Sequence, residues 1–165
     1  LDAELIRMEF KKVNISDLIR VLIKIREKSL GYKIEFINKK QDVFVLGDET
    51  KIAQVLDNII NNAYSFSPKN GKIFIKLIEI SSKIHITIED NGPGFPKSAL
   101  KKVFNRFYSE RPVSEEFGKH SGLGLSISKQ IIEAHQGVIF AENKLDKNQV
   151  VSGARIVIIL EKNKN

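Results

Sequence analysis

Runs of alternating apolar and polar residues, and shorter runs that are continuously apolar, mark the strands of this chain. Residues 83–89 read Lys-Ile-His-Ile-Thr-Ile-Glu, which is typical of a strand with one buried face. Residues 157–160 are uniformly apolar, as expected of a central strand covered on both faces. Only Ser81 and Ser82 separate two of the runs, which predicts a hairpin. Together the patterns predict strands at residues 33–37, 43–46, 72–80, 83–89, 138–141 and 154–160.

A helical spacing of apolar residues appears in three longer segments. The first lies at about 17–29, with Ser16 or Asp17 as the expected N-cap. A second helix opens at Asp48 and continues past Ala63. The apolar face expected for the first helix consists of Leu18, Val21, Leu22 and Ile25.

The third predicted helix runs from Gly122 to about His135. The long segment before it, at about 95–121, has no clear period and is expected to form an irregular lid with one short helix around 98–104. These elements predict an α/β fold, a two-layer sandwich in which helices cover one face of a mixed sheet.

Composition narrows the class of protein. The 165 residues suit one domain, and residues 1–12 are expected to be the end of a preceding helix, with the domain itself spanning 13–165. The absence of cysteine excludes disulfides and thiolate metal sites, and no apolar run is long enough to span a bilayer. The net charge of +7 is scattered, without a basic helix carrying interleaved aromatics, so nucleic acid is not an expected partner.

A carboxylate stands at the end of one predicted strand. Asp90 is followed by Asn91, Gly92, Pro93 and Gly94, so two glycines free the backbone just after it. A buried aspartate in such a place can accept a hydrogen bond from an exocyclic amine such as that of adenine. The alternative interpretation is a tight turn between two elements.

Two asparagines lie one turn apart on the second predicted helix. Asn58 and Asn62 share a face that is flanked by apolar positions, so burying their amides is costly unless a ligand satisfies them. A hydrated Mg²⁺ completed by phosphates would do so. The alternative is a pair of asparagines that face solvent.

The third predicted helix opens with two glycines. Gly122 and Gly124 leave backbone N–H groups free to point at an anion, and the helix dipole assists. Lys119 and His120 lie just upstream and either approach the same phosphates or are solvated side chains of the lid.

Four segments in a fixed order resemble the motifs of bacterial sensor histidine kinases. Residues 48–63 are similar to the N box, residues 90–95 to the first glycine box, residues 103–108 to the F box and residues 122–127 to the second glycine box. The wider superfamily includes gyrase, a mismatch-repair ATPase and a heat-shock chaperone. The resemblance implies the Bergerat-type ATP-binding fold, a mixed five-stranded sheet with three helices on one face.

The resemblance also implies roles for individual residues, with ATP and Mg²⁺ as the bound cofactors. Asp90 matches the residue that reads the adenine amino group, and Gly92 and Gly94 match the backbone of the adenine pocket. Asn58 and Asn62 match the Mg²⁺–phosphate positions. The remaining candidates for ATP binding are Arg106, Lys119, His120, Gly122, Leu123 and Gly124.

Phe104 and Phe107 match lid residues that pack against the domain. Arg106 is a triphosphate or interdomain contact, or else a surface ion-pair partner. The chain departs from the common pattern at three places: Ser65 replaces a frequent lysine, Ser109 a frequent arginine, and Gln136 a frequent glycine.

The expected function is that of a sensor kinase domain that binds Mg·ATP and donates the γ-phosphoryl group to a histidine. That acceptor must belong to a separate dimerisation domain, because His85, His120 and His135 do not stand in a helical His-Glu or His-Asp setting. The family implies a response regulator downstream, an isolated domain that is monomeric, and a full-length homodimer anchored in the inner membrane with this domain in the cytoplasm. Competing hypotheses are a serine-directed anti-sigma kinase, against which the F-box segment argues, and a binding module that has lost ATP.

Overall fold

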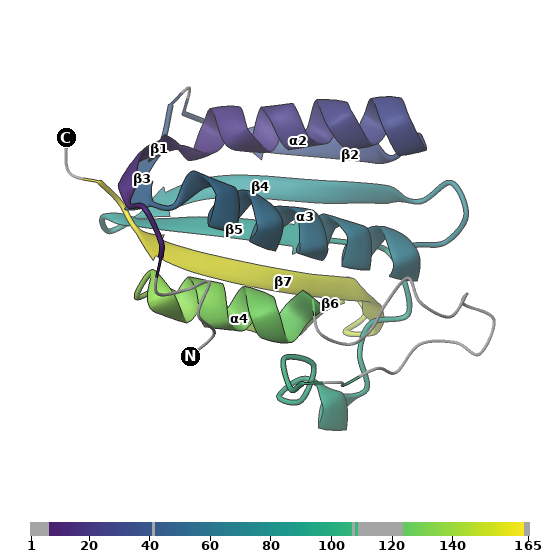
Figure 1. Ribbon diagram of the computed structural model, residues 1–165. Helices are drawn as coiled ribbons and strands as arrows, with labels where there is room; N and C mark the ends of the chain where they lie inside the picture. Colours follow the sequence, from purple (N-terminus) through teal and green to yellow (C-terminus); the bar gives the residue numbers. More distant parts are fainter. Residues whose placement is uncertain (1–6, 41, 107, 109–123, 164–165) are drawn as a thin grey trace.

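The fold places three helices against one face of a five-stranded sheet (Figure 1). A computed structural model of the chain describes residues 7–40, 42–106, 108 and 124–163. The strand order is β2-β4-β5-β7-β6, in which β2 runs parallel to β4 and the other neighbours are antiparallel. The strands are β2 (Lys33–Asn38), β4 (Lys72–Ile80), β5 (Lys83–Glu89), β6 (Val138–Leu145) and β7 (Val151–Glu161).

The helices are α2 (Ile15–Leu30), α3 (Glu49–Phe66) and α4 (Gly124–Ala134). The core lies between them and the sheet, because alternate residues of β4 and β5, such as Ile75 and Ile86, are buried against helical residues such as Ile59 and Ile60. The predicted two-layer α/β sandwich with a mixed five-stranded sheet is therefore confirmed. No helix among these described residues has the length and apolar character needed to cross a membrane.

A second, two-stranded sheet was not expected. Strand β1 (Lys11–Asn14) pairs antiparallel with β3 (Phe44–Gly47), so the predicted strand at 43–46 does not join the main sheet. Lys11 and Lys12 consequently lie in a strand and not in the end of a helix. The physical reason is that Val13 and Val45 are buried as neighbouring residues of this small sheet, while the lysines face solvent.

Helix α2 begins and packs differently from the expectation. Its N-cap is Asn14, whose side chain accepts a hydrogen bond from the Asp17 backbone N–H, and not Ser16 or Asp17. The core-facing residues are Ile15, Ile19 and Ile23.

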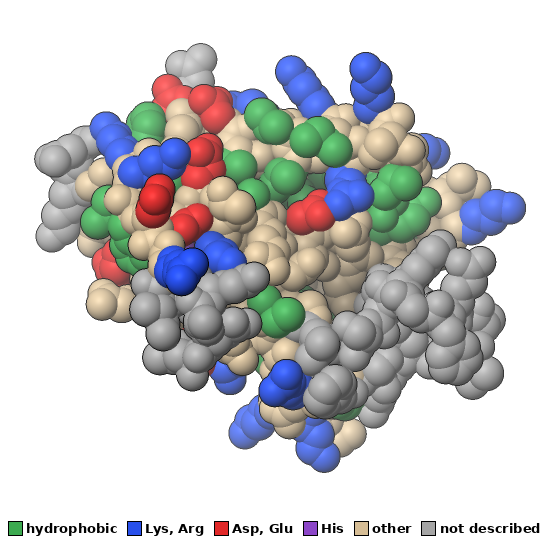
Figure 2. Space-filling model, viewed as in Figure 1, with side chains coloured by type: hydrophobic (Ala, Val, Ile, Leu, Met, Phe, Trp, Pro, Cys, Tyr) green, Lys and Arg blue, Asp and Glu red, His purple; other side chains and the backbone are tan. Residues whose placement is uncertain are grey.

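The predicted apolar face of α2 is instead a second stripe beside the buried one. Leu18 and Leu22 are partly buried, whereas Val21 and Ile25 are 53% and 51% exposed. Hydrophobic side chains accordingly appear at the surface over α2 in Figure 2. Two apolar stripes adjoin on one helix, and spacing alone does not indicate which of them faces the sheet.

The segment after β5 is irregular, as expected. The predicted short helix around 98–104 is a single 3₁₀ turn, η1 (Lys97–Ala99), followed by further turns up to Arg106. Ala99, Val103 and Phe104 are buried in the hydrophobic core, so this first part of the lid is packed against the domain. Strands β6 and β7 are longer than predicted and form an extended hairpin.

Candidate functional site

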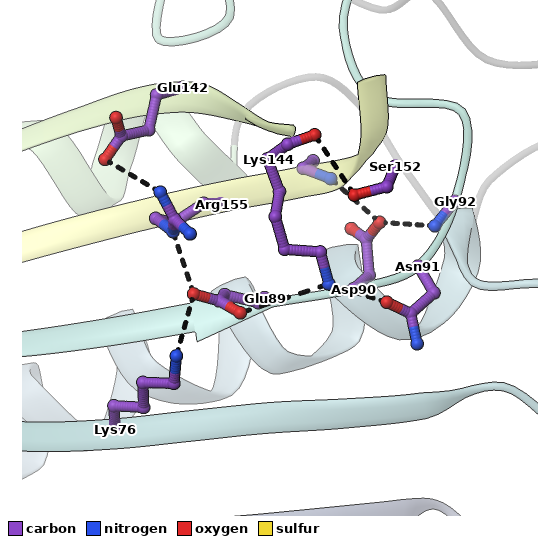
Figure 3. Close-up of polar contacts among 10 residues, drawn as sticks. Lys76, Glu89, Asp90, Asn91, Gly92, Glu142, Lys144, Ser152 and Arg155 are labelled. Carbon is purple, nitrogen blue, oxygen red and sulfur yellow. Dashed lines mark hydrogen bonds and ion pairs between the residues drawn. The ribbon is translucent and has the colours of Figure 1, made fainter. Parts of the chain in front are cut away.

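Asp90 lies directly after β5 and is almost completely buried, with 3% of its surface exposed. Its Oδ1 atom accepts hydrogen bonds from the backbone N–H groups of Gly92 at 2.8 Å and Ala154 at 3.2 Å (Figure 3). Its own N–H donates to the Ala154 carbonyl at 3.0 Å. Within the described part of the chain, both donors to the carboxylate converge on Oδ1, so Oδ2 is left to accept a bond from a ligand.

Burial raises the pKa of the Asp90 carboxyl above its ordinary value of 3.8. The two backbone donors and the Lys144 ammonium act in the opposite direction, and Glu89 adds to the increase. A carboxylate that is poorly hydrated gains more from a ligand donor than an exposed one does, because the ligand's N–H replaces missing water. The Asp90 carboxylate is thus held in one orientation, with Oδ2 available to accept a hydrogen bond.

The two glycines after Asp90 are required by close packing. A Cβ at Gly92 would lie 2.1 Å from the Phe66 carbonyl oxygen. Gly94 has a φ of +75°, in the left-handed region, and a Cβ there would lie 2.5 Å from Val151 Cγ1. The backbone of this loop therefore passes between the end of α3 and the β6–β7 hairpin, where only glycine fits.

Phe66, the last residue of α3, is a site residue that the sequence did not point out. It forms an edge-on aromatic contact with Phe95, with ring centroids 6.0 Å apart, and its carbonyl abuts Gly92. The pair places aromatic surface beside the loop that follows Asp90. The available signal was an aromatic residue at a helix end, which by itself is indistinguishable from core packing.

The predicted asparagine pair lies at the other end of the site, on α3. Asn58 and Asn62 are both half-buried, one helical turn apart. Asn58 Nδ2 donates to the carbonyl of Gly124 at 3.4 Å, so the middle of α3 meets the first residue of α4. This use of Nδ2 leaves the Asn58 Oδ1 atom for another partner. Ser128 Oγ also donates to the Gly124 carbonyl, at 2.8 Å, within the first turn of α4.

The orientation of α3 is set from its opposite side by α2. Arg26 forms a two-pronged ion pair with Asp57, and its Nε–H donates to Asp57 Oδ1 at 2.6 Å. Tyr32 Oη donates to Asn61 Oδ1 at 3.1 Å, and the Tyr32 ring stacks on Tyr64. Asn61 is therefore engaged with Tyr32, on the α2 side of the helix, whereas Asn58 is hydrogen-bonded to α4.

The other predicted site residues divide into two groups. Arg106 is described and exposed, and Phe104 is buried as expected of a lid residue that packs on the domain. Ser65, where the resemblance led us to expect lysine, donates its hydroxyl to the Asn62 carbonyl at 2.9 Å. Outside the described residues lie Phe107, Ser109, Lys119, His120, Gly122 and Leu123.

Two of the three histidines are described, and both have structural settings. His135 is buried, its Nε2 accepts from the Asp48 backbone N–H at 3.0 Å, and its Nδ1 lies 2.7 Å from the Ile131 carbonyl. It therefore ties the end of α4 to the start of α3. His85 lies mid-strand on β5, half-buried, on the face of the sheet away from the helices.

Comparisons with known proteins agree on one family. The profile of the histidine kinase-, DNA gyrase B- and HSP90-like ATPases matches residues 47–164. The sensor protein ChvG of Rhizobium meliloti (strain 1021) is 42% identical over 97% of this chain. The chain spans only 30% of the length of that curated relative.

Solved structures give the same result. The catalytic domain of the histidine kinase ThkA, in a nucleotide-free form, superposes with a TM-score of 0.80 at 30% identity, covering 94% of this chain and 97% of the other. ThkA in complex with the response regulator protein TrrA superposes with a TM-score of 0.77 at 28% identity, covering 94% of this chain and 42% of that one. The resemblance drawn from the four motifs is thus confirmed.

Proposed function

Because this chain belongs to the family of histidine kinase-, DNA gyrase B- and HSP90-like ATPases, we propose that it binds Mg·ATP between α3 and α4 and supplies its γ-phosphoryl group to a histidine of a separate domain. The observation that carries this proposal is the geometry of Asp90. A buried carboxylate with Oδ1 fixed by two backbone N–H groups presents Oδ2 as an acceptor, which matches the 6-amino group of adenine.

The opposite end of the site suits a triphosphate. The first turn of α4 faces Asn58, and the unpaired N–H groups of a helix N-terminus favour an anion. In this assignment the Gly124 backbone, with Gly122 and Leu123 before it, contacts the phosphates. Lys119, His120 and Arg106 are the cationic candidates for the same oxygens.

The residues present also fit Mg²⁺. The ion takes oxygen ligands and is usually completed by water and substrate phosphates, and neutral carboxamides do not repel those phosphates. Asn58 Oδ1 is left for such a ligand because Nδ2 is engaged with Gly124. Asn62, one turn on, supplies the second carboxamide. When bound, the ion would neutralise charge on the β- and γ-phosphate oxygens.

The chain's own part in phosphoryl transfer is to hold the nucleotide in position. The nucleophile is a histidine nitrogen on a dimerisation domain: it forms the new N–P bond as the bond between phosphorus and the β,γ-bridging oxygen breaks, and ADP leaves. His85 and His135 do not serve, because one lies mid-strand and the other is hydrogen-bonded inside the fold. In the full-length protein, a membrane-anchored homodimer with this domain in the cytoplasm, a response regulator receives the phosphoryl group next.

Two measurements test the proposal in sequence. Calorimetric titration with ATP, with and without Mg²⁺, is expected to show one site with Mg²⁺-dependent affinity. Supplying a dimerisation hairpin in trans is then expected to give phosphate on that hairpin that is labile to acid, as phosphohistidine is. Absence of binding would leave only the fold, and acid-stable phosphate would indicate a hydroxyl acceptor and a different kinase class.

A further inference from the structure

The loop that follows Asp90 is held along most of its length by the β6–β7 hairpin. Besides the Ala154 contacts with Asp90, the hairpin provides two neighbouring side chains of β6, Asn143 and Lys144. The register of the hairpin shifts between Lys144 and Leu145, so Lys144 stands at an irregularity of the ladder and Asn143 directly before it. Such irregularities often redirect side chains toward functional sites.

Asn143 is bonded to the backbone of Phe95 through both ends of its amide. Its Oδ1 accepts from the Phe95 N–H at 2.8 Å, and its Nδ2 donates to the Phe95 carbonyl at 2.7 Å. The same Oδ1 lies where a Cβ on Gly94 would be only 2.8 Å away. The Asn143 side chain thus bonds both backbone groups of Phe95, as a neighbouring strand would, at the residue where the lid begins.

Lys144 holds the first part of the loop from the other side of β6. Its Nζ donates to Asn91 Oδ1 at 2.6 Å and lies 4.0 Å from Glu89 Oε2 (Figure 3). The ammonium also lies 5.4 Å from the centroid of the Phe74 ring, and the side chain is only 17% exposed. Lys144 therefore connects the residues on both sides of Asp90.

Glu89 makes this connection rigid, because it is itself strongly fixed. Its side chain is 5% exposed, and Oε1 accepts from Arg155 Nε at 2.8 Å and lies 3.5 Å from Lys76 Nζ. Arg155 in turn pairs with Glu142 on β6 at 3.6 Å. Removing one partner from a buried, hydrogen-bonded charge network costs more than breaking an exposed pair, so the network restricts the groups that it holds.

From these contacts we infer that Asn143 and Lys144 are positioning residues for base recognition. They fix the backbone on either side of Gly92, and hence the direction in which Asp90 Oδ2 points, without touching the nucleotide. The inference rests on the proposed function, since it assumes that Asp90 reads the base. It extends that function by assigning base selectivity to two residues that stand outside all four sequence motifs.

The test measures selectivity, not affinity alone. Dissociation constants for ATP and inosine triphosphate are compared, because these nucleotides differ only at the edge that Asp90 faces. For Asn143→Ala and Lys144→Met, the preference for ATP is expected to fall by about tenfold, as expected from the loss of one or two hydrogen bonds that orient the acceptor. Affinity for inosine triphosphate should change little, because its tail contacts remain.

The same hairpin offers matched controls. Asn148→Ala and Lys147→Met make the same exchanges in the exposed turn between β6 and β7 and should keep the wild-type preference. Equal losses for both nucleotides, or an unchanged preference in the Asn143 and Lys144 variants, would overturn the inference. If Asn143→Ala does not fold, Asn143→Ser and Lys144→Met carry the test. Lack of ATP binding by the wild-type protein would contradict the proposed function, which is a different outcome.

Discussion

The two ends of the candidate site are built differently. At the base end, Asp90, Asn91, Gly92 and Phe95 are each held by hydrogen bonds or close contacts with β6, β7 or the end of α3. At the phosphate end, Asn58 and Gly124 share one long hydrogen bond of 3.4 Å, and a Cβ on Gly124 would find its nearest neighbour at 3.8 Å.

This difference in contacts suggests that the two ends of the site have different roles. Under the proposed function, the contacts of the Asp90 loop with the rest of the protein shape the base pocket, so selectivity for the base would be available before a ligand arrives. The end assigned to the phosphates offers half-buried polar groups and a helix terminus, which under the proposed function gain partners from the ligand. Variants at the base end should therefore affect folding or selectivity, and variants at the phosphate end should affect ligand and metal affinity.

The largest effect is expected from Asp90→Asn. The two backbone N–H groups should retain an oxygen at the Oδ1 position, which turns the amide NH₂ toward the base. The amide donor of the variant then faces the amino donor of adenine, and neither has an acceptor. ATP affinity should therefore fall by about a hundredfold. Inosine triphosphate presents an acceptor at the same position and should bind the variant better than ATP. Calorimetry with both nucleotides decides, and retention of the ATP preference would remove Asp90 from base recognition.

Alanine substitutions at Gly92 and Gly124 should change the stability of the protein differently, because the two glycines lie at opposite ends of the site. In Gly92→Ala the new methyl group would meet the Phe66 carbonyl, and we expect the free energy of unfolding to fall by about 1–3 kcal/mol. Gly124→Ala has room in the helix and should leave that free energy unchanged or raise it by up to about 1 kcal/mol. Urea denaturation of both variants measures the contrast. Equal destabilisation would mean that the two ends are equally constrained.

Asn62→Ala probes the metal at the phosphate end. ATP affinity measured with Mg²⁺ should fall by about tenfold, toward the value measured with EDTA, because a carboxamide ligand of the ion is lost. Asn61→Ala is the matched control, since Asn61 is engaged by Tyr32 on the other side of α3. A variant at Asn62 that keeps the full Mg²⁺ dependence would refute the metal assignment.

Acidification should weaken ATP binding at the base end. Burial raises the pKa of Asp90 above 3.8, so its carboxylate takes up a proton at a higher pH than an ordinary aspartate and then no longer accepts from adenine. We therefore expect the affinity of the wild-type protein for ATP, divided by that of Asp90→Asn, to decline by a few-fold as pH falls toward the raised pKa. Protonation of the nucleotide itself affects both proteins equally and cancels in this ratio.

Acidification should weaken ATP binding but increase the contribution of Asp90 to the free energy of unfolding. The folded chain binds the proton more tightly than the unfolded chain, so the contribution of Asp90 to the free energy of unfolding decreases as pH rises through the interval between 3.8 and the raised pKa. Urea denaturation of wild type and Asp90→Asn across that interval checks the sign. A stability difference that does not vary with pH would contradict the raised pKa.

The smallest effect concerns Ser65, where the family pattern favours lysine. Ser65→Lys should tighten ATP binding by about threefold at low salt, and the gain should shrink as ionic strength rises, because the added ammonium acts through partly screened charge. Ser65→Met gives an unbranched side chain of similar length without the charge and should show no gain. An equal gain from methionine would indicate packing and not a phosphate contact.

The sequence predicted the main elements because their signals are local. The alternation of 83–89 and the motif around Asn58 fall within single elements, and the motif that begins at Asp90 is one contiguous segment, so pattern and resemblance suffice to find them. The small β1–β3 sheet was missed because its two strands lie about 30 residues apart in the chain, and the N-cap of α2 was misplaced because the expected cap is engaged by a similarly distant residue. Ser16, for instance, is buried with its hydroxyl accepting from the Val43 N–H, instead of capping the helix.

The same limit applies within the site. Asp90 and its glycines form a contiguous motif, whereas Asn143, Lys144 and Ala154 come from a hairpin more than 45 residues later and carry no recognisable pattern. Likewise, the choice between the Ile15–Ile19–Ile23 stripe and the Val21–Ile25 stripe of α2 depends on how the helix sits on the sheet. Sequence reasoning finds the group that contacts a ligand more readily than the groups that hold it in place.

Strand β7 lies between β5 and β6, although it is the last element of the chain. A nascent polypeptide that has been made only as far as the second glycine box already carries all four motifs, yet it lacks the Ala154 amide that bonds Asp90 and the β6 side chains that bond the loop after it. Under the proposed function, the acceptor for adenine is therefore completed only when β7 has joined the sheet beside β5.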